Sequence, residues 1–145
     1  MITTILLLDK DAEAGAAFEK ALQEASPGTR LHWAKTAEEA SEMLTVLQPD
    51  LLFLDINDAN PCLQPYEMVM SSSVSRTIPI VMHCRSQNPT HIAWGYSYGA
   101  TLFFKKPSHY GVLVMGLRKV LEGNWKHIDA PWLYQTPSLK TAKVA

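Results

Sequence analysis

Residues 49–55 read Pro-Asp-Leu-Leu-Phe-Leu-Asp, and this stretch decides the fold class of the 145-residue chain. Its four central residues are all apolar, without the polar alternation of a strand that has one face in water. A short, continuous apolar run is typical of a strand that is buried on both faces of a parallel sheet. The stretch therefore predicts a central strand with helices packed on both of its sides.

Four other short runs predict strands at residues 3–8, 30–34, 78–82 and 101–104; all are mainly apolar except 30–34, which carries Leu31 and Trp33 on one face. Between the five runs, apolar residues recur at helical spacing. They predict helices over residues 11–25, 37–47, 66–74, 90–98 and 108–121. Strands that alternate with helices in this way predict a parallel sheet covered on both faces. We expect a flavodoxin-like (βα)5 α/β fold, a doubly wound sheet with the strand order 2-1-3-4-5.

Local signals mark where several of these helices begin and end. Thr36 with Glu39 three residues later forms a capping box, and Asp11 is expected to cap the first helix. Ser108 is expected to cap the last helix. Residues 71–73 are three serines, which are poor helix formers, so the helix predicted at 66–74 is a weak one.

The composition predicts one globular domain, with 47% hydrophobic and 19% charged residues. Thirteen basic residues against fourteen acidic ones give a net charge of −1, which argues against nucleic-acid or membrane-surface binding. Cys62 and Cys84 have no metal-binding or redox spacing, so we expect reduced thiols and a cytoplasmic protein. We expect the domain to cover residues 1–123. Residues 124–145 are expected to form a C-terminal tail that packs on the domain or on a partner.

The residues that follow the strands carry most of the candidate chemistry, because ligands of open α/β sheets bind beyond the carboxyl ends of the strands. Four such groups are Asp9-Lys10-Asp11, Asp55-Ile56-Asn57, His83-Cys84-Arg85 and Lys105-Lys106-Pro107. Acidic and basic side chains are therefore expected to meet at one edge of the sheet.

From about residue 3 to residue 123, the chain resembles the receiver domain of two-component response regulators. The resemblance rests on residues 5–9, 49–55, 78–82 and 99–107, taken in this order. The spacing between key residues also matches the family. Asp55 lies 46 residues after Asp9, and Lys106 lies 22 residues after Cys84.

The resemblance implies a role for each of these residues. Asp55 would accept a phosphoryl group from the phosphohistidine of a histidine kinase, and Lys106 would pair first with this aspartate and then with the phosphoryl oxygens. Asp9, Asp55 and the backbone carbonyl of Asn57 would hold Mg²⁺. Cys84 occupies the switch position, at which the family usually has a serine or a threonine.

Three positions depart from the family pattern. Lys10 replaces the second acid of the usual pair, so Mg²⁺ is expected to bind weakly or not at all. Cys84 is a poorer hydrogen-bond donor than a hydroxyl. Arg85 stands where a small residue is usual. Beside these positions, we interpret His83 as a structural residue at the end of a strand.

We expect a single-domain receiver, a phosphoacceptor with self-catalysed phosphotransfer rather than an ordinary enzyme. Its partners would be a sensor histidine kinase or a phosphotransfer protein, and a downstream protein or second copy of the chain. The downstream contact would use the helix at 90–98, the strand at 101–104 and the helix at 108–121. The alternative is a pseudo-receiver, a binding module without phosphotransfer, and Lys10 favours it. A flavin-binding protein is disfavoured because no Ser/Thr/Gly-rich loop follows the first strand.

Overall fold

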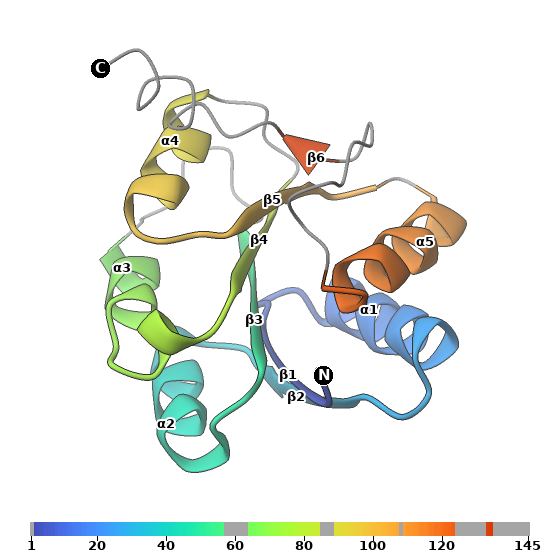
Figure 1. Cartoon of the computed structure of the whole chain (residues 1–145), viewed down its shortest axis with the longest axis horizontal. Helices are drawn as coiled ribbons and strands as arrows, with labels where there is room; N and C mark the ends of the chain where they lie inside the picture. Colours follow the sequence, from blue (N-terminus) through green and yellow to red (C-terminus); the bar gives the residue numbers. More distant parts are fainter. Residues whose placement is uncertain (1, 57–63, 85–88, 108, 124–132, 135–145) are drawn as a thin grey trace.

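Five parallel strands and five α-helices alternate along the chain (Figure 1). The structure is a computed structural model that describes residues 2–56, 64–84, 89–107, 109–123 and 133–134. In chain order the elements are β1 (Thr4–Leu8), α1 (Ala12–Ala25), β2 (Arg30–Ala34), α2 (Ala37–Leu47), β3 (Leu51–Ile56), α3 (Gln64–Met70), the 3-10 turn η1 (Ser75–Thr77), β4 (Ile80–Cys84), α4 (Pro89–Ser97), β5 (Leu102–Lys105), α5 (Tyr110–Leu121) and β6 (Leu133–Tyr134).

The sheet has the order β2-β1-β3-β4-β5-β6, and β1 to β5 are parallel. The predicted flavodoxin-like order 2-1-3-4-5 is therefore confirmed. The short strand β6 was not predicted, and it pairs antiparallel with β5 through Phe103↔Tyr134 and Phe104↔Leu133. Of the tail that was expected over residues 124–145, these two residues are the part that the structure describes.

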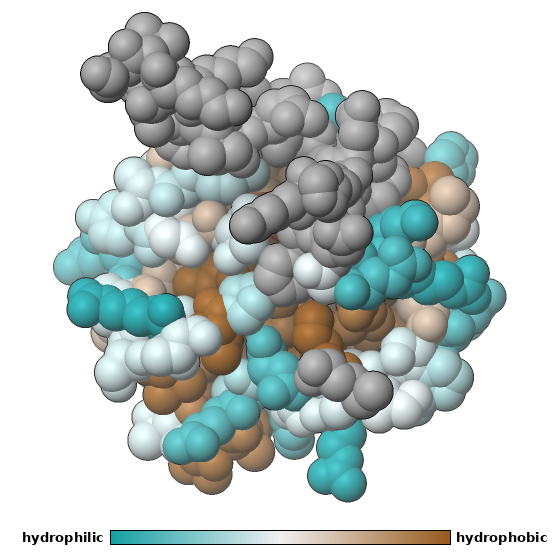
Figure 2. Space-filling model, viewed as in Figure 1, coloured by the Kyte–Doolittle hydropathy of each residue, from teal (hydrophilic) through white to brown (hydrophobic). Residues whose placement is uncertain are grey.

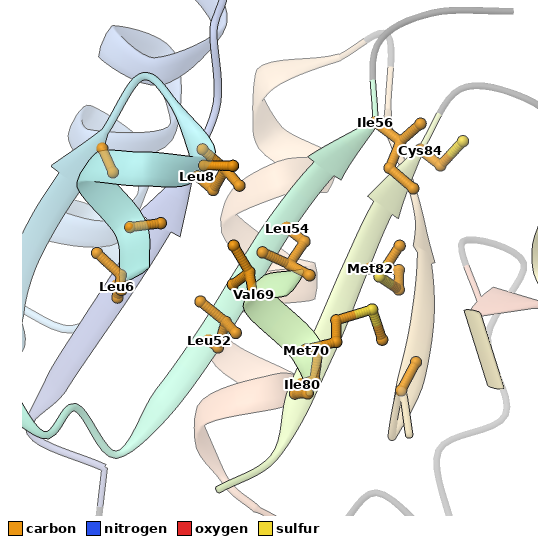
Figure 3. Packing of buried hydrophobic residues seen from close by; sticks show 14 of the residues in the cluster. Leu6, Leu8, Leu52, Leu54, Ile56, Val69, Met70, Ile80, Met82 and Cys84 are labelled. Carbon is orange, nitrogen blue, oxygen red and sulfur yellow. The ribbon is translucent and has the colours of Figure 1, made fainter. Parts of the chain in front are cut away.

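Helices cover both faces of the sheet, with α1 and α5 on one side and α2, α3 and α4 on the other (Figure 1). Alternate strand residues supply the two cores, as the period of a strand requires. Ile5, Leu7 and Phe53 pack towards α1 and α5. The opposite cluster contains Leu6, Leu8, Leu52, Leu54, Ile56, Met82 and Cys84, together with Val69 and Met70 from α3 (Figure 3). Burial on both faces explains why β1, β3, β4 and β5 show no polar alternation, whereas the edge strand β2 alternates Arg30 and His32 with Leu31 and Trp33.

The helix starts follow the capping signals in two cases. The side chain of Asp11 accepts hydrogen bonds from the backbone N–H groups of Glu13 and Ala14, and that of Thr36 accepts one from Glu39. Both predicted caps are confirmed. Ser108, the predicted cap of the last helix, lies outside the described residues; the N-cap residue of α5 is His109, which makes no side-chain capping bond.

Several elements are displaced from their predicted bounds, among them the following three. The weak helix ends at Met70, directly before the three serines at 71–73, and a separate 3-10 turn follows. Strand β3 continues through Ile56, and β4 covers 80–84 instead of 78–82. The last two displacements place Asp55 and His83 inside paired strands, not in the loops after them.

On the outer surface, hydrophilic side chains surround smaller hydrophobic areas on the face that Figure 2 shows. Among the described residues, no helix combines the length and the apolar character that crossing a membrane requires.

Candidate functional site

The carboxyl ends of β1, β3, β4 and β5 bring three predicted site residues together. Asp9 directly follows β1, Asp55 is the penultimate residue of β3, and Lys106 directly follows β5. The backbone N–H of Lys106 donates to the carbonyl of Cys84 at 2.9 Å, which extends the β4–β5 pairing by one residue. Strand pairing therefore fixes the backbone positions from which these three side chains extend.

Lys106 lies between the two acids. Its Nζ is 2.6 Å from Oδ2 of Asp55 and 3.9 Å from Oδ2 of Asp9. The three side chains are only 8%, 1% and 2% exposed for Lys106, Asp55 and Asp9. Since water screens such a buried contact little, the ammonium and the Asp55 carboxylate form a charge-assisted hydrogen bond.

Asp9 is held in place by bonds from three sides. Its Oδ1 accepts the backbone N–H of Asp11 at 2.9 Å, and its own N–H donates to the carbonyl of Ala34 at 3.0 Å. The indole Nε1 of Trp33 donates to the carbonyl of Asp9 at 2.9 Å. These bonds fix the backbone of Asp9 and hold its carboxylate beside Lys106.

The two oxygens of the Asp55 carboxyl have different surroundings. Oδ2 faces Lys106, whereas Oδ1 is buried and accepts no hydrogen bond from any residue that the structure describes. Burial raises the pKa of Asp55 from 3.8 to about 7, against the lowering effect of Lys106 and with a further rise caused by Asp9. Removal from water disfavours the charged carboxylate, and one lysine compensates this only in part.

His83 is a site residue that the sequence analysis missed. It is the direct neighbour of Asp55 in the β3–β4 pairing, and its Nδ1 lies 3.6 Å from Oδ2 of Asp55. The residue is 2% exposed. A signal existed in the sequence, because an imidazole inside an apolar run is unusual. The interpretation as a structural strand-end residue overlooked that pairing puts it next to Asp55.

Cys84 points the other way. It is fully buried and belongs to the cluster under α2, α3 and α4. Figure 3 shows it beside Ile56, its pairing neighbour at the end of β3. Within the strand, Cys84 and His83 alternate, so it is His83 that shares a sheet face with Asp55. Asn57 and Arg85, which the sequence analysis singled out, lie outside the described residues.

An open hollow of about 220 Å³ adjoins Asp55. Its lining consists of Leu8, Lys10, Lys35, Ala37, Asp55, Pro65 and Tyr66. The hydroxyl of Tyr66 donates to the backbone carbonyl of Asp55 at 3.3 Å, so α3 is tied to the end of β3. Lys10 and Lys35 are both exposed at this hollow. Their two ammonium groups therefore line the approach to the buried carboxyl of Asp55.

The described side chains fit a divalent cation poorly. Asp9 and Asp55 are the two carboxylates at hand, and no group of three or more His, Cys, Asp or Glu side chains within the described ranges is arranged so that it could hold a metal ion. Oδ1 of Asp55 could serve as a ligand, since it is buried without a bond from these residues. Against this, Lys106 occupies Oδ2, and Lys10 adds a positive charge where cations would approach.

A second surface feature is the aromatic group on α4. Tyr96 packs on Phe103 with ring centroids 5.4 Å apart, and its hydroxyl accepts the backbone N–H of Phe103 at 3.2 Å. Trp94 is partly buried, and its Nε1 donates to Glu67 at 3.1 Å. Tyr98 is 41% exposed. Core packing therefore accounts for Trp94 and Tyr96, whereas Tyr98 presents its ring to the outside.

Comparisons with known proteins agree with this architecture at the level of the fold. A scan against models of protein families and a search of curated sequences both find no match. Many solved structures do match, among them a response regulator protein from Burkholderia multivorans with 25% identity and a TM-score of 0.62, which covers 90% of this chain and 99% of that one.

Two further matches were solved in liganded or modified form. The Mn²⁺-bound response regulator Rcp1 has 15% identity and a TM-score of 0.69 over 89% of this chain and 99% of its own. The phosphorylated cyanobacterial phytochrome response regulator RcpA has 19% identity and a TM-score of 0.68 over 93% of this chain and 100% of its own. The chain thus has the fold of response-regulator receiver domains.

Proposed function

We propose that residues 1–123 form a receiver domain that accepts a phosphoryl group on Asp55. The donor would be the phosphohistidine of a sensor histidine kinase or of a phosphotransfer protein. One observation carries the proposal, namely the 2.6 Å contact between Lys106 Nζ and Asp55 Oδ2 at the carboxyl ends of β5 and β3 in a receiver fold. Oδ1 of Asp55 would attack phosphorus while the phosphorus–nitrogen bond of the donor breaks and its electron pair returns to the imidazole.

The charges of the site support this chemistry. The transferred phosphoryl group spreads negative charge over its equatorial oxygens, so catalysis depends on positioning and on nearby cations. Lys106 supplies one buried cation, and Lys10 and Lys35 line the hollow through which a donor would approach. The carboxyl of Asp55 has a pKa of about 7, so a large fraction of it is ionised and able to attack at neutral pH.

Mg²⁺ would bind weakly at this site. Asp9, Asp55 and the backbone carbonyl of Asn57 would hold it, with Lys10 opposing them. The ion would contribute positive charge at the phosphoryl oxygens when it is bound. We infer that Lys106, Lys10 and Lys35 neutralise more of the phosphoryl charge here than lysines do in receivers that have a full acid pair.

The output would be a protein–protein contact made by α4, β5 and α5, in the cytoplasm. Tyr98, directly after α4, and Tyr110 and Met115 on α5 are exposed large side chains, 41%, 37% and 59% exposed. The partner would be a downstream protein or a second copy of the chain, and the net charge of −1 argues against nucleic acid and membrane surfaces. Residues 124–145 would act as a tail on the domain or on the partner.

The second candidate function is that of a pseudo-receiver, which binds partners without accepting phosphate. The specific observation in its favour is that Lys106 already pairs with Asp55 while Lys10 stands in an acid's place. Lys10 would then supply permanently the positive charge that a bound metal ion brings in other receivers.

Mass spectrometry after treatment with acetyl phosphate and Mg²⁺ separates the two candidates. Under the first proposal, wild type gains one acid-labile phosphoryl group and Asp55→Asn gains none. Asp50→Asn is the matched control, because Asp50 lies before the opposite end of β3 and should leave labelling intact. No label on wild type would support the pseudo-receiver, and label that persists in Asp55→Asn would assign the acceptor to another residue.

A further inference from the structure

His83 has a fixed orientation next to the proposed phosphoacceptor. Its ring lies among three phenylalanine rings, with centroid distances of 6.2 Å to Phe18, 5.9 Å to Phe53 and 5.0 Å to Phe104. The last two contacts are edge-to-face. Because the interior is close-packed, the imidazole has little freedom to rotate away from Asp55. Its Nδ1 therefore stays on the Oδ2 side of the carboxyl, at 3.6 Å.

This arrangement makes the two oxygens of Asp55 chemically unequal. Oδ2 has Lys106 at 2.6 Å and His83 at 3.6 Å, whereas Oδ1 accepts no bond from the described part of the chain. Attack by Oδ1 would leave Oδ2 as the carbonyl oxygen of an acyl phosphate. Lys106 would then be drawn to the new phosphoryl oxygens, which carry the greater negative charge. Among the described residues, His83 would then remain beside Oδ2 as a hydrogen-bond donor.

We propose that His83 is a positioning residue that donates from Nδ1 to Oδ2 of Asp55 and so stabilises the carboxylate as the leaving group when the phosphoryl group is lost. The role rests on the proposed phosphorylation of Asp55. In the hydrolysis step, water attacks phosphorus, the bond between phosphorus and Oδ1 breaks, and its electron pair returns to the carboxylate. The released phosphate keeps the oxygen of the water, and the proton passes to the phosphate or to solvent. A distance of 3.6 Å is too long for a hydrogen bond at rest, but catalytic contacts often shorten only in the reacting complex.

The proposal predicts unequal effects on the two directions of transfer. The transition state of phosphoryl transfer is loose, so little bonding to the nucleophile has formed. Its rate therefore depends more on the leaving group than on the attacking oxygen. Removing the donor at Oδ2 should slow hydrolysis about tenfold, since hydrogen bonds to charged groups are the strong ones. The rate of phosphorylation by acetyl phosphate should change less than about twofold, because there Asp55 is the nucleophile.

Two amide variants provide a matched test. In His83→Asn the side-chain N–H lies near the position of Nδ1, whereas in His83→Gln it lies near that of Nε2. Both variants are polar and similar in size. We expect His83→Asn to retain a phosphoryl half-life within about threefold of wild type and His83→Gln to lengthen it about tenfold. His32→Leu controls for loss of an imidazole elsewhere, since His32 lies on the edge strand β2.

The measurements are intact mass during labelling by acetyl phosphate with saturating Mg²⁺, and intact mass during decay after the donor is removed. A ¹⁵N–¹H spectrum of the histidine rings of unphosphorylated wild type shows directly which ring nitrogen carries the proton. Protonation of Nδ1, together with a longer half-life in His83→Gln alone, supports the proposal. Protonation of Nε2 alone overturns it, and this readout does not depend on phosphorylation or on the stability of a variant.

The kinetic outcomes separate this proposal from the proposed function. Label on wild type with equal half-lives in wild type, His83→Asn and His83→Gln overturns the role of His83 and leaves Asp55 as the acceptor. Equal slowing of labelling and of decay also overturns it, because a purely structural defect would have that effect. Absence of label on wild type overturns the proposed function, and the role of His83 with it.

Discussion

Asp55→Asn should stabilise the protein above neutral pH and leave its stability nearly unchanged at about pH 4. The pKa of Asp55 lies at about 7 in the folded protein, against an ordinary value of 3.8, chiefly because the carboxyl is buried. Between these two values the folded state binds more protons than the unfolded chain. The free energy of unfolding of wild type therefore falls as pH rises through this window. Asn has the shape of the protonated carboxyl but carries no charge at any pH. It therefore avoids the free-energy cost of burying the ionised carboxylate.

The size of the effect follows from the same two values. A rise from 3.8 to about 7 corresponds to roughly 4 kcal/mol, at about 1.36 kcal/mol for each pKa unit. The attraction to Lys106 already lowers the folded-state pKa, so the lost ion pair is not counted a second time. We expect Asp55→Asn to be more stable than wild type by about 2–4 kcal/mol at about pH 8.

Urea unfolding of both proteins at several values between about pH 4 and pH 8, with a metal chelator present, measures this difference. Asp50→Asn is a control of opposite sign. Hydrogen bonds from the backbone and the hydroxyl of Thr3 lower the pKa of Asp50. Its charged form is therefore stabilising, and that contribution is lost as pH falls through its lowered pKa. A stability difference for Asp55→Asn that did not vary with pH, or a less stable variant at about pH 8, would refute the reasoning.

Three further predictions concern the metal, the switch position and the core. Lys10→Asp should raise Mg²⁺ affinity, measured by calorimetry, and tight Mg²⁺ binding by the unmodified protein would contradict the role given to Lys10. Cys84→Thr should leave the NMR shifts of the region 98–104 on phosphoanalogue binding as they are in wild type, because Cys84 points into the cluster under α2, α3 and α4 and away from Asp55; larger shifts in the variant would contradict this placement. Gly95→Ala should cost about 1–3 kcal/mol in thermal or urea unfolding, because the added Cβ would meet a ring carbon of Phe103 at 2.4 Å; an unchanged midpoint would show that the ring can move aside.

The order of the strands was predictable because each strand carries a local signal. Runs such as residues 51–54 are apolar without interruption, and the intervening helices keep a helical period. With parallel pairing, these signals leave few topologies. The convergence of Asp9, Asp55 and Lys106 followed from the same rule, since every strand of a parallel sheet delivers its carboxyl end to one edge.

The sequence marked His83 as an imidazole within an apolar run, but its position next to Asp55 depends on pairing register. Predicting β4 at 78–82 left His83 in a loop, and a shift of two residues places it inside the sheet. Only the pairing Asp55↔His83 makes the two side chains neighbours. Register is decided by packing on both sheet faces, which a single sequence does not display. The pKa of Asp55 is likewise a property of burial and not of its local sequence.

The pairing of β6 with β5 bears on how the protein avoids association with its own copies. Strand β5 would otherwise be the last strand of the sheet, and it carries the apolar pair Phe103-Phe104. An uncovered edge of this kind offers unpaired backbone groups to any other extended chain and is a common start of aggregation. Two residues of β6 occupy part of that edge. A chain shortened at Gly123 would expose this edge, and we expect it to aggregate more readily at high concentration.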